Sequence, residues 1–223
     1  MINLVIFDMD GTVLDTEVLR FDCFNEVFRN MGLTFSRDLY ASLLGKRQGE
    51  SKQMLEQIFG VDLINDESLY HKLEELEVQK MKNGIKVKPG YEKLRAYLKT
   101  SGIDMALATS TYRKKAEECL ALAEITDDFS LIICGDEVIH GKPDPEIFLT
   151  VAEKKGITSD QIMVLEDSFS GVQAAHDAGM VTVMVPDMRE PTKEISQLLY
   201  KKAGDLNEVI CIIEEFNTKG SNL

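Results

Sequence analysis

The stretch VIFDMDGTVLDTE, residues 5–17, joins the end of an apolar run to two closely spaced carboxylates. The run Ile2–Phe7 is short and rich in β-branched and large apolar residues, which predicts a buried strand. Asp8 and Asp10 follow it directly, in front of a Gly-Thr pair. Because a buried charge is costly unless it is paired or binds a metal ion, this stretch is either a helix-capping turn or a functional site.

Strands alternate with helices along most of the remaining chain. Four further short apolar runs predict buried strands, over Ile103–Thr109, Leu131–Cys134, Ile162–Glu166 and Val181–Val185. Amphipathic segments predict helices between them, for example over Tyr91–Ser101 and Tyr112–Glu124. Another helix should begin at Pro145 with Asp144 as its N-cap, and Asp205 should cap the last one. This alternation is typical of βαβ units, so we expect an α/β fold with a Rossmann-like parallel sheet and helices on both faces.

Between about Thr16 and Gly84 the alternation stops, and no convincing strand is visible. The periodicity of this segment predicts helices over Glu17–Asn30, Arg37–Leu44, Glu50–Phe59 and Glu67–Asn83. Ser36 is expected to cap the second of these helices. We therefore predict two domains, a core of residues 1–15 and 86–223 and a helical insertion of residues 16–85. The chain passes between them near Asp15 and Lys86, which are candidate hinges.

The composition is that of a globular protein with a strong negative charge. Its 223 residues include 38 Asp and Glu against 25 Lys and Arg, for a formal net charge of −13. Nucleic acids and anionic membrane surfaces need clustered Lys and Arg, so neither is expected as a partner. No signal-peptide pattern, no apolar run of about 18 residues and no C-x-x-C pair is visible. We expect a cytoplasmic protein with reduced cysteines, and we take it to be a monomer.

Polar residues follow several of the predicted strands. Thr109–Thr111 lie at the end of the second strand, Glu166 and Asp167 at the end of the fourth, and Lys142 in the loop after the third. In an open parallel sheet, ligands bind at the carboxyl ends of the strands. We therefore expect these residues to gather around Asp8 in one site.

Each of these residue types suits a phosphate monoester as ligand. Asp8 with Asp167 offers hard oxygen ligands for Mg²⁺, which proteins usually bind with one or two carboxylates and substrate phosphate. Thr109 and the backbone N–H groups after it can bind phosphate oxygens at the start of a helix. Lys142 supplies a local cation, and Asp10 can transfer a proton.

Each residue also has an ordinary structural explanation. The alternatives are a strand-to-turn pair for Asp8 and Asp10, caps of the following helices for Thr109–Thr111 and for Glu166-Asp167, and a solvated loop position for Lys142. We favour the functional interpretation because separate strand ends both carry acids. His140 has no evident partner and is interpreted as solvated.

The four segments resemble, in chain order, the motifs of the haloacid dehalogenase-like hydrolase superfamily. Asp8-Met-Asp10-Gly-Thr is similar to the first motif and Thr109 to the second. Lys142 in GKPDPEIF is similar to the third, and Glu166-Asp167 in LEDSFSGVQAA to the fourth. The inserted helices match the cap of the branch that contains capped phosphatases and β-phosphoglucomutase-like proteins. The resemblance covers nearly the whole core and implies a Rossmann-like catalytic core with a helical cap.

The resemblance also implies a role for each motif. Asp8 would be the nucleophile that forms an aspartyl-phosphate, and Asp10 the general acid and base. Thr109, Ser110 and Lys142 would bind the phosphate. The implied cofactor is Mg²⁺, with ligands from Asp8, the backbone carbonyl of Asp10, Asp167 and, directly or through water, Glu166.

The substrate implied by the resemblance is a small phosphorylated metabolite, which in this family is chosen by the cap. Candidate substrate-binding residues in the insertion are Glu17, Arg20, Lys46 and Arg47. β-Phosphoglucomutases typically carry a His at the place of Arg20 and a Lys-Asn pair where this chain has Tyr112-Arg113. These departures favour a Mg²⁺-dependent phosphatase that acts on phosphorylated sugars.

Two alternative functions remain open at this point. The first is a phosphomutase of the β-phosphoglucomutase type, and the second is a regulator that binds a phosphorylated ligand without turnover. A two-component receiver domain also combines acids, a Thr or Ser and a Lys on a parallel sheet. Receiver domains are shorter, lack an inserted cap and place their acids in a different order, so this class fits less well.

Overall fold

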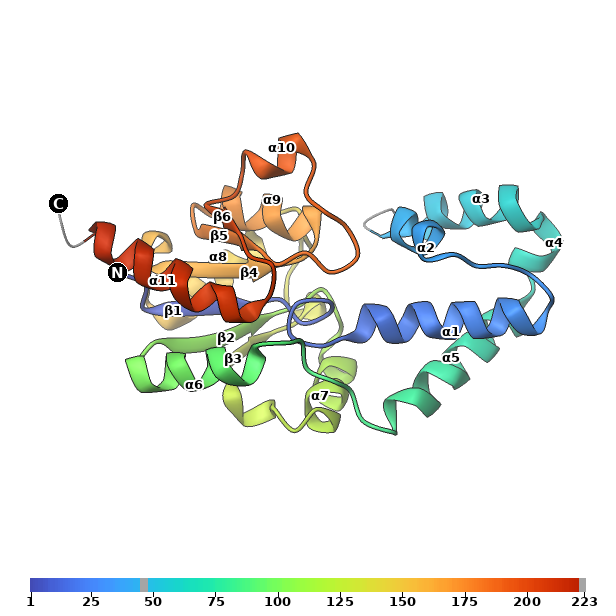
Figure 1. Cartoon of the computed structure of the whole chain (residues 1–223), viewed down its shortest axis with the longest axis horizontal. Helices are drawn as coiled ribbons and strands as arrows, with labels where there is room; N and C mark the ends of the chain where they lie inside the picture. The colour runs from blue at the N-terminus through green and yellow to red at the C-terminus, as the bar shows by residue number, and fades with distance from the viewer. Residues whose placement is uncertain (45–47, 221–223) are drawn as a thin grey trace. The chain divides into compact units, whose positions relative to one another are not determined.

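The computed structural model describes residues 1–44 and 48–220, and the chain forms two compact units (Figure 1). The core unit comprises Met1–Asp15 and Ile85–Leu223, and the helical unit is the continuous insertion Thr16–Gly84. Within the core unit, the segments that flank the insertion pair with each other. The Asp15 amide donates a hydrogen bond to the Lys86 carbonyl at 2.9 Å.

A parallel sheet forms the middle of the core unit. Within the described residues it has six strands in the order β3-β2-β1-β4-β5-β6, and each neighbouring pair is parallel. The strands are β1 (Leu4–Phe7), β2 (Asp104–Ala108), β3 (Leu131–Ile133), β4 (Ile162–Glu166), β5 (Val181–Met184) and β6 (Lys201–Lys202). β1 lies between β2 and β4, with Phe7 level with Leu107 and Leu165. This register places the residues that follow the three central strands next to one another.

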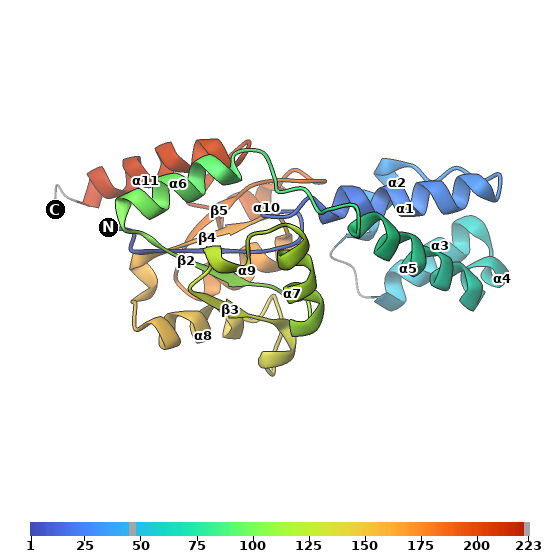
Figure 2. The ribbon, with the colours of Figure 1, turned by 90° about the horizontal axis from the view of Figure 1, so that it is seen from below.

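Helices cover both faces of this sheet. The helices of the core unit are α6 (Tyr91–Ser101), α7 (Arg113–Leu122), α8 (Glu146–Lys155), α9 (Phe169–Asp177), α10 (Lys193–Ser196) and α11 (Leu206–Gly220). The short α10 buries no residue and packs against α9. Figure 2 shows α6 and α11 side by side on one side of the strands and α8 on the other. α6 buries Tyr91, Leu94 and Leu98, which share one helix face, and it ends at Gly102 with φ +68°.

The sheet is buried on both faces, as expected of a parallel sheet. Ile6 of β1 belongs to an apolar cluster with Phe148 of α8 and Ala175 of α9. The next residue, Phe7, contacts the ring of Tyr91 edge-on, with the ring centroids 6.2 Å apart. Full burial of side chains of this size contributes roughly 1.5–3 kcal/mol each, so β1 is held firmly where the polar residues follow it.

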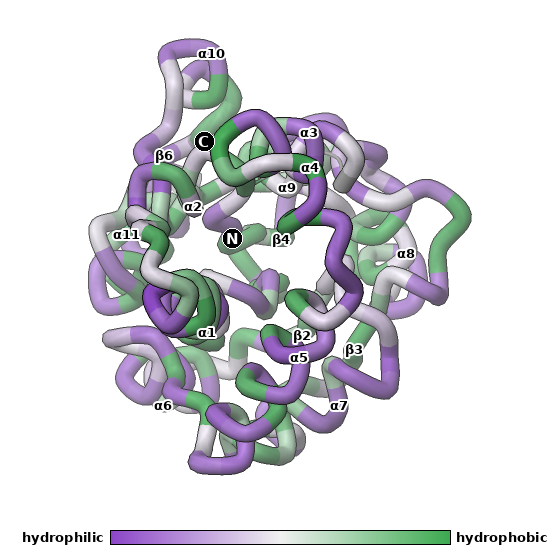
Figure 3. Tube along the Cα trace, turned by 90° about the vertical axis from the view of Figure 1, so that its right-hand side faces the viewer, coloured by the Kyte–Doolittle hydropathy of each residue, from purple (hydrophilic) through white to green (hydrophobic). Residues whose placement is uncertain are grey.

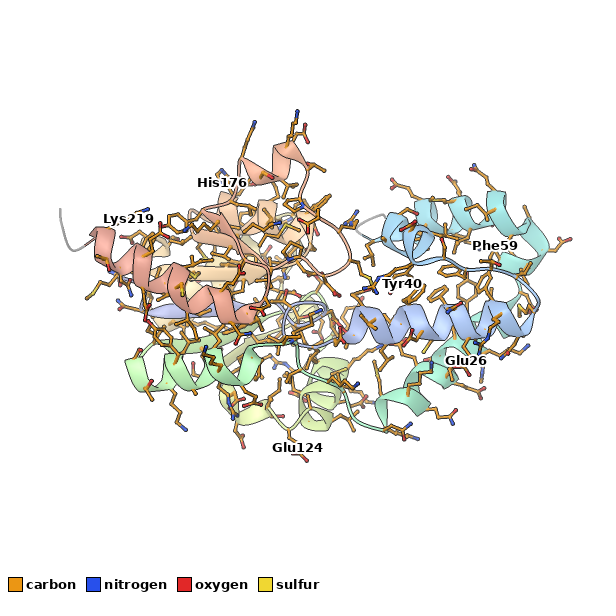
Figure 4. The ribbon with its side chains drawn as sticks, viewed as in Figure 1. Glu26, Tyr40, Phe59, Glu124, His176 and Lys219 are labelled. Carbon is orange, nitrogen blue, oxygen red and sulfur yellow. The ribbon has the colours of Figure 1, made fainter. Side chains whose placement is uncertain are left out.

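The helical unit has its own aromatic core. Its helices are α1 (Thr16–Asn30), α2 (Arg37–Leu43), α3 (Gln48–Phe59), α4 (Val61–Ile64) and α5 (Glu67–Met81). Phe24, Phe28, Phe35, Tyr40 and Phe59 form a connected set of ring contacts, from 4.7 Å between the centroids of Phe28 and Phe59 to 6.4 Å between those of Phe35 and Tyr40. Figure 4 shows Tyr40 and Phe59 pointing toward α1.

Hydrophilic residues recur along the helices of the chain (Figure 3). Among the described residues, no helix combines the length and the apolar character needed to span a membrane.

The predicted α/β fold with a parallel sheet and helices on both faces is confirmed. The predicted strand Ile162–Glu166 agrees with β4 at both ends. The other four predicted strands extend one or two residues beyond the observed ones, because the ends of apolar runs lie outside the hydrogen-bonded ladders. β1, for example, begins at Leu4 rather than at Ile2. The pattern missed β6, α4 and α10, whose few residues give no measurable periodicity.

The helix caps give a mixed result. Ser36 and Asp205 act as expected, since the Ser36 hydroxyl accepts from the Leu39 amide at 3.1 Å and the Asp205 carboxylate from the Asn207 amide at 2.8 Å. The expected N-cap Asp144 is wrong by one position. Pro145 is the N-cap of α8, which begins at Glu146, and Asp144 accepts a hydrogen bond from the Glu146 amide at 2.9 Å.

Candidate active site

The site begins where β1 ends. The Asp8 amide donates a hydrogen bond to the Leu165 carbonyl of β4 at 3.0 Å, so the register of the sheet fixes this residue. Asp8 is buried, with 8% of its surface exposed. The chain turns sharply after it, and Gly11 adopts a φ of +81°, a conformation that disfavours other residues. The Asp8 carboxylate is therefore a buried charge in a rigid position.

Lys142 pairs with this carboxylate from the loop after β3. Its Nζ donates to Asp8 Oδ1 at 2.6 Å, to Glu166 Oε1 at 2.6 Å and to the Ala108 carbonyl at 3.0 Å. An ammonium group has three donors, and each has an acceptor here. The Lys142 side chain is 4% exposed, so the alternative of a solvated loop lysine is wrong.

Burial and charge act on this cluster in opposite directions. Burial raises the pKa of Asp8 well above its usual range, Glu166 raises it further, and the Lys142 charge partly opposes both. Burial by itself would lower the pKa of Lys142, but the two carboxylates outweigh it and raise that pKa. Lys142 therefore keeps its positive charge at neutral pH.

Glu166 is held at both of its oxygens. Oε1 accepts from Lys142, while Oε2 accepts from the Ser168 amide at 3.0 Å and from the Ser168 hydroxyl at 2.8 Å. The Ser168 hydroxyl also accepts from the Gly171 amide and is the N-cap of α9, which corrects the alternative of Glu166-Asp167 as a plain cap. A Cβ at Gly171 would lie 1.8 Å from Glu166 Oε1, so only glycine fits against this carboxylate.

Three carboxylates form a candidate metal site. Ligand oxygens of Asp8, Glu166 and Asp167 all lie within 4.8 Å of one another. Asp167 lies against Gly11, where a Cβ would be 2.4 Å from Asp167 Oδ2, and Thr12 Oγ1 lies 3.5 Å from Asp167 Oδ1. This oxygen-only donor set fits Mg²⁺, a hard cation. Because both Glu166 oxygens already accept hydrogen bonds, Asp8 and Asp167 are the better direct ligands.

Asp10 connects to the loop after β2. The Thr111 hydroxyl donates to Asp10 Oδ2 at 2.7 Å, and the Thr111 amide donates to the Thr109 hydroxyl at 3.1 Å. Thr109 is buried. Ser110 is close to Gly135, where a Cβ would lie 2.3 Å from the Ser110 carbonyl oxygen. The predicted residues of the first two strand ends are thus linked through Thr111.

The structure excludes the alternative that Thr109–Thr111 cap the next helix. Tyr112 is the N-cap of α7, and its side chain makes no capping hydrogen bond. The Arg113 amide instead donates to Asp136 Oδ1 at 2.9 Å. The two threonine hydroxyls face Asp10 and the Thr111 amide, so both take part in the loop of the site.

The sequence reasoning expected Thr111 near the site but gave it no role, and it gave none to Ser168 and Gly171. All three support the carboxylates. The available signal for Thr111 and Ser168 was their position just after a strand end, whereas Gly171 lies inside α9. His140 is exposed as predicted, but the statement that it has no partner is wrong, because its Nδ1 lies 2.9 Å from Glu146 Oε2.

The candidates in the insertion lie in the helical unit. Arg20 Nη1 pairs with Glu17 Oε1 at 3.2 Å, and Arg20 Nε pairs with Glu77 at 3.3 Å. The Tyr40 hydroxyl donates to Glu17 Oε2 at 2.7 Å, and burial followed by the Glu17 charge raises the pKa of Tyr40. Lys46 and Arg47 lie outside the described residues. Glu17, Arg20, Tyr40 and Glu77 form a cluster of their own within α1, α2 and α5.

A model of the haloacid dehalogenase-like hydrolase family matches residues 5–185. The match spans most of the chain, and all four motifs of the site lie inside it. The chain therefore belongs to the haloacid dehalogenase-like hydrolase family and is an enzyme, as the motifs predicted. Membership of this family also removes the receiver-domain alternative.

Three relatives indicate the branch. The phosphorylated carbohydrates phosphatase of Thermotoga maritima is 34% identical over 177 residues, covering 79% of this chain and 81% of the relative. The β-phosphoglucomutase of Bacillus subtilis is 31% identical over 192 residues, covering 81% and 82%. A crystal structure of a CbbY variant from Rhodobacter sphaeroides with xylulose 1,5-bisphosphate is 27% identical, with a TM-score of 0.69 and coverage of 93% and 96%. Two of these relatives thus carry the names of a phosphatase and a phosphomutase of phosphorylated sugars, and the third was solved with a sugar bisphosphate.

Proposed function

We propose that this protein is a Mg²⁺-dependent phosphatase that hydrolyses small phosphorylated sugars through an aspartyl-phosphate on Asp8. The observation that carries the proposal is the buried Asp8–Lys142–Glu166 cluster at the end of β1, with Asp167 and Asp10 beside it. The phosphorylated carbohydrates phosphatase among the relatives supports the sugar-phosphate class.

In the first half of the reaction, the Asp8 carboxylate attacks phosphorus and the bond to the leaving alkoxide breaks. Asp10, oriented by the Thr111 hydroxyl at 2.7 Å, donates the proton that the leaving oxygen needs. In the second half, Asp10 takes a proton from water, and the hydroxide attacks phosphorus and releases Asp8 and inorganic phosphate. Lys142 holds the Asp8 carboxylate in one orientation throughout.

General acid–base help contributes roughly 10²–10⁴-fold, far less than the roughly 10²¹-fold that phosphate monoesters can require. The remaining acceleration must come from alignment and charge stabilisation. The Thr109–Ser110 loop supplies hydrogen-bond donors for the phosphate oxygens. Lys142, whose three donors are taken by Asp8, Glu166 and the Ala108 carbonyl, contributes its positive charge. Mg²⁺, when bound by Asp8, Asp167 and the Asp10 carbonyl, with Glu166 acting through water, would neutralise charge on the transferred phosphoryl group.

We further propose that the helical unit is the cap of the enzyme. Two features support this assignment: its place in the chain directly after the Asp8–Asp10 motif, and its separate aromatic core. Glu17 and Arg20, paired in α1, together with Lys46 and Arg47, are proposed as its substrate-binding residues. The core unit is then the catalytic domain, and Asp15 and Lys86 are the hinge positions.

The proposal is tested by phosphate release from a panel of sugar phosphates, phosphoglycolate and nucleotides, with and without Mg²⁺. We expect turnover that depends on Mg²⁺ and is abolished by Asp8→Asn. Asp62→Asn, on an exposed position of α4, makes the same chemical change away from the site and should have wild-type activity.

The alternatives predict other results. Conversion of β-glucose 1-phosphate to glucose 6-phosphate that outpaces phosphate release would favour a phosphomutase, as the Bacillus subtilis relative allows. Tight binding of a phosphate ester with no release and no isomerisation would favour a regulator. Release that persists in Asp8→Asn would exclude Asp8 as the nucleophile.

A further inference from the structure

Arg189, in the loop after β5, has an unusual environment for a cation. Its guanidinium carbon lies 4.3 Å from the centroid of the Phe169 ring, which is the distance of a stacked pair. Across residues 1–44 and 48–220 it forms no hydrogen bond and no ion pair within 4.0 Å. Arg189 is only partly exposed, and burial lowers its pKa. A guanidinium carries five N–H donors, so this group has unused capacity to bind an anion.

The loop that carries Arg189 is fastened on both sides of it. The Val185 amide donates to the Glu166 carbonyl at 2.8 Å, which ties the start of the loop to the end of β4. Asp187 accepts from Lys88 Nζ at 2.7 Å and has a side chain that is 4% exposed. On the other side, Glu190 pairs with Lys202 at 2.9 Å. These contacts fix the backbone on both sides of Arg189.

The stacking partner places Arg189 at the sheet edge that carries the site. Phe169 is the first residue of α9 and follows Asp167 and Ser168 directly. The Asp167 charge acts on Arg189 and partly offsets the effect of burial on its pKa. Arg189 therefore stacks on a ring that follows Asp167 by two residues, and within the described residues it forms no salt bridge to that carboxylate.

The site is rich in carboxylates, and the lysine within it has no hydrogen-bond donor to spare. Asp8, Asp10, Glu166 and Asp167 are four carboxylates, and Lys142 is fully used by Asp8, Glu166 and a backbone carbonyl. A substrate with two phosphates would bring two anionic groups to this edge. Lys142 has no donor left for the second group, whereas Arg189 has all of its donors available.

We propose that Arg189 is a specificity-determining residue that binds the second phosphate of a sugar bisphosphate while the first phosphate occupies the Asp8 site. The planar guanidinium matches two phosphate oxygens, and stacking on Phe169 holds the plane in place. The inference deepens the proposed phosphatase function and rests on it. It implies that bisphosphates are preferred over the corresponding monophosphates.

Binding and turnover of one matched series test the proposal. Calorimetry with Mg²⁺ in the Asp8→Asn background compares the binding of fructose 1,6-bisphosphate with that of fructose 1-phosphate and fructose 6-phosphate. Kinetics in the protein that keeps Asp8 compare KM and kcat for the same three sugars. Arg189→Gln should weaken bisphosphate binding by about 10-fold or more and change binding of either monophosphate by less than about 2-fold. The kcat for the bisphosphate should change little, because Arg189 does not contact the reacting atoms.

Three further variants sharpen the test. Arg189→Lys keeps the positive charge but lacks the planar guanidinium, so it should bind the bisphosphate more tightly than Arg189→Gln and more weakly than wild type. Phe169→Leu removes the ring on which Arg189 stacks and should also weaken bisphosphate binding in part. Lys193→Gln removes an exposed positive charge a few residues along the chain and should change nothing.

Equal effects of Arg189→Gln on all three sugars, or no effect on any, would overturn the inference. A higher Mg²⁺ requirement for every ester would also overturn it, because Arg189 would then act through Asp167. If the protein that keeps Asp8 released no phosphate from any of the esters, the proposed function would be overturned instead. The calorimetric comparison would still decide the role of Arg189.

Discussion

The core unit and the helical unit each hold a cation between two acidic side chains, but in different surroundings. In the core unit, Lys142 lies between Asp8 and Glu166, with side chains that are 4%, 11% and 0% exposed. In the helical unit, Arg20 lies between Glu17 and Glu77, with side chains that are 26%, 12% and 20% exposed. The first cluster is nearly dry, and water still reaches the second.

The two clusters also differ in what builds them. Glu17 and Arg20 are three residues apart on one helix, and such neighbours meet wherever that helix forms. Asp8 and Lys142 are 134 residues apart and meet only when β1, β2 and the loop after β3 are all in register. The core cluster thus depends on the complete sheet, and water cannot replace a partner that is removed. We expect perturbations there to cost much more.

The largest expected effect comes from removing each cation. Lys142→Met leaves two buried carboxylates without the cation that compensates them and should destabilise the protein by about 3–5 kcal/mol. Arg20→Met breaks partly exposed pairs and should cost at most about 1 kcal/mol. Urea unfolding of both variants, followed by circular dichroism without Mg²⁺, gives the two values. Similar losses in the two variants would show that burial does not distinguish the clusters.

A smaller contrast is expected between two glycines. Gly171→Ala would place a Cβ 1.8 Å from Glu166 Oε1, so α9 or Glu166 must shift, at a cost of about 1–3 kcal/mol. Gly49 lies in α3 of the helical unit. Apart from its chain neighbours and the backbone of α3, no atom of the described residues lies within 4 Å of the place that a Cβ would take there. Gly49→Ala should therefore be neutral or stabilise by up to about 1 kcal/mol. Thermal unfolding measures both. Phosphate release should also fall in Gly171→Ala, because Glu166 holds Lys142; unchanged stability and activity there would contradict the packing argument.

The same contrast explains which parts of the structure could be predicted from the sequence. Fold and strand ends follow from local patterns, so the apolar runs located the five longer strands and the acids after them. β6 has two residues, Lys201 and Lys202, and no apolar pattern could reveal it. The strand order, with β1 between β2 and β4, needed the resemblance or the structure, since periodicity does not encode which strands are neighbours.

The site was predictable as a set of residue types but not as a network. The motifs identified Asp8, Lys142 and Glu166, yet they did not show that one ammonium would fill all its donors with two carboxylates and a carbonyl. Ser168 lies within the fourth motif, but the motif did not show its hydrogen bond to Glu166. Arg189 lies outside every motif, and its contact with Phe169 joins the loop after β5 to the start of α9. Such contacts depend on side-chain packing, which a single sequence specifies only through the finished fold.

The smallest expected effect is a pH dependence of the stability loss, which Lys142→Met should show and Arg20→Met should not. Burial raises the pKa of Asp8, and Lys142→Met removes the charge that opposes this rise. A carboxyl group with a raised folded pKa contributes stability that is fully present below its unfolded pKa of about 3.9 and is lost as pH rises through the folded pKa. The stability difference between Lys142→Met and wild type should therefore be smaller at about pH 5 than at about pH 8. Urea midpoints at both pH values measure it. The dependence should be smaller in Asp8→Asn/Lys142→Met, which lacks the Asp8 carboxyl group but keeps Glu166. A constant difference in Lys142→Met would mean that Asp8 does not carry the cost of the missing ammonium.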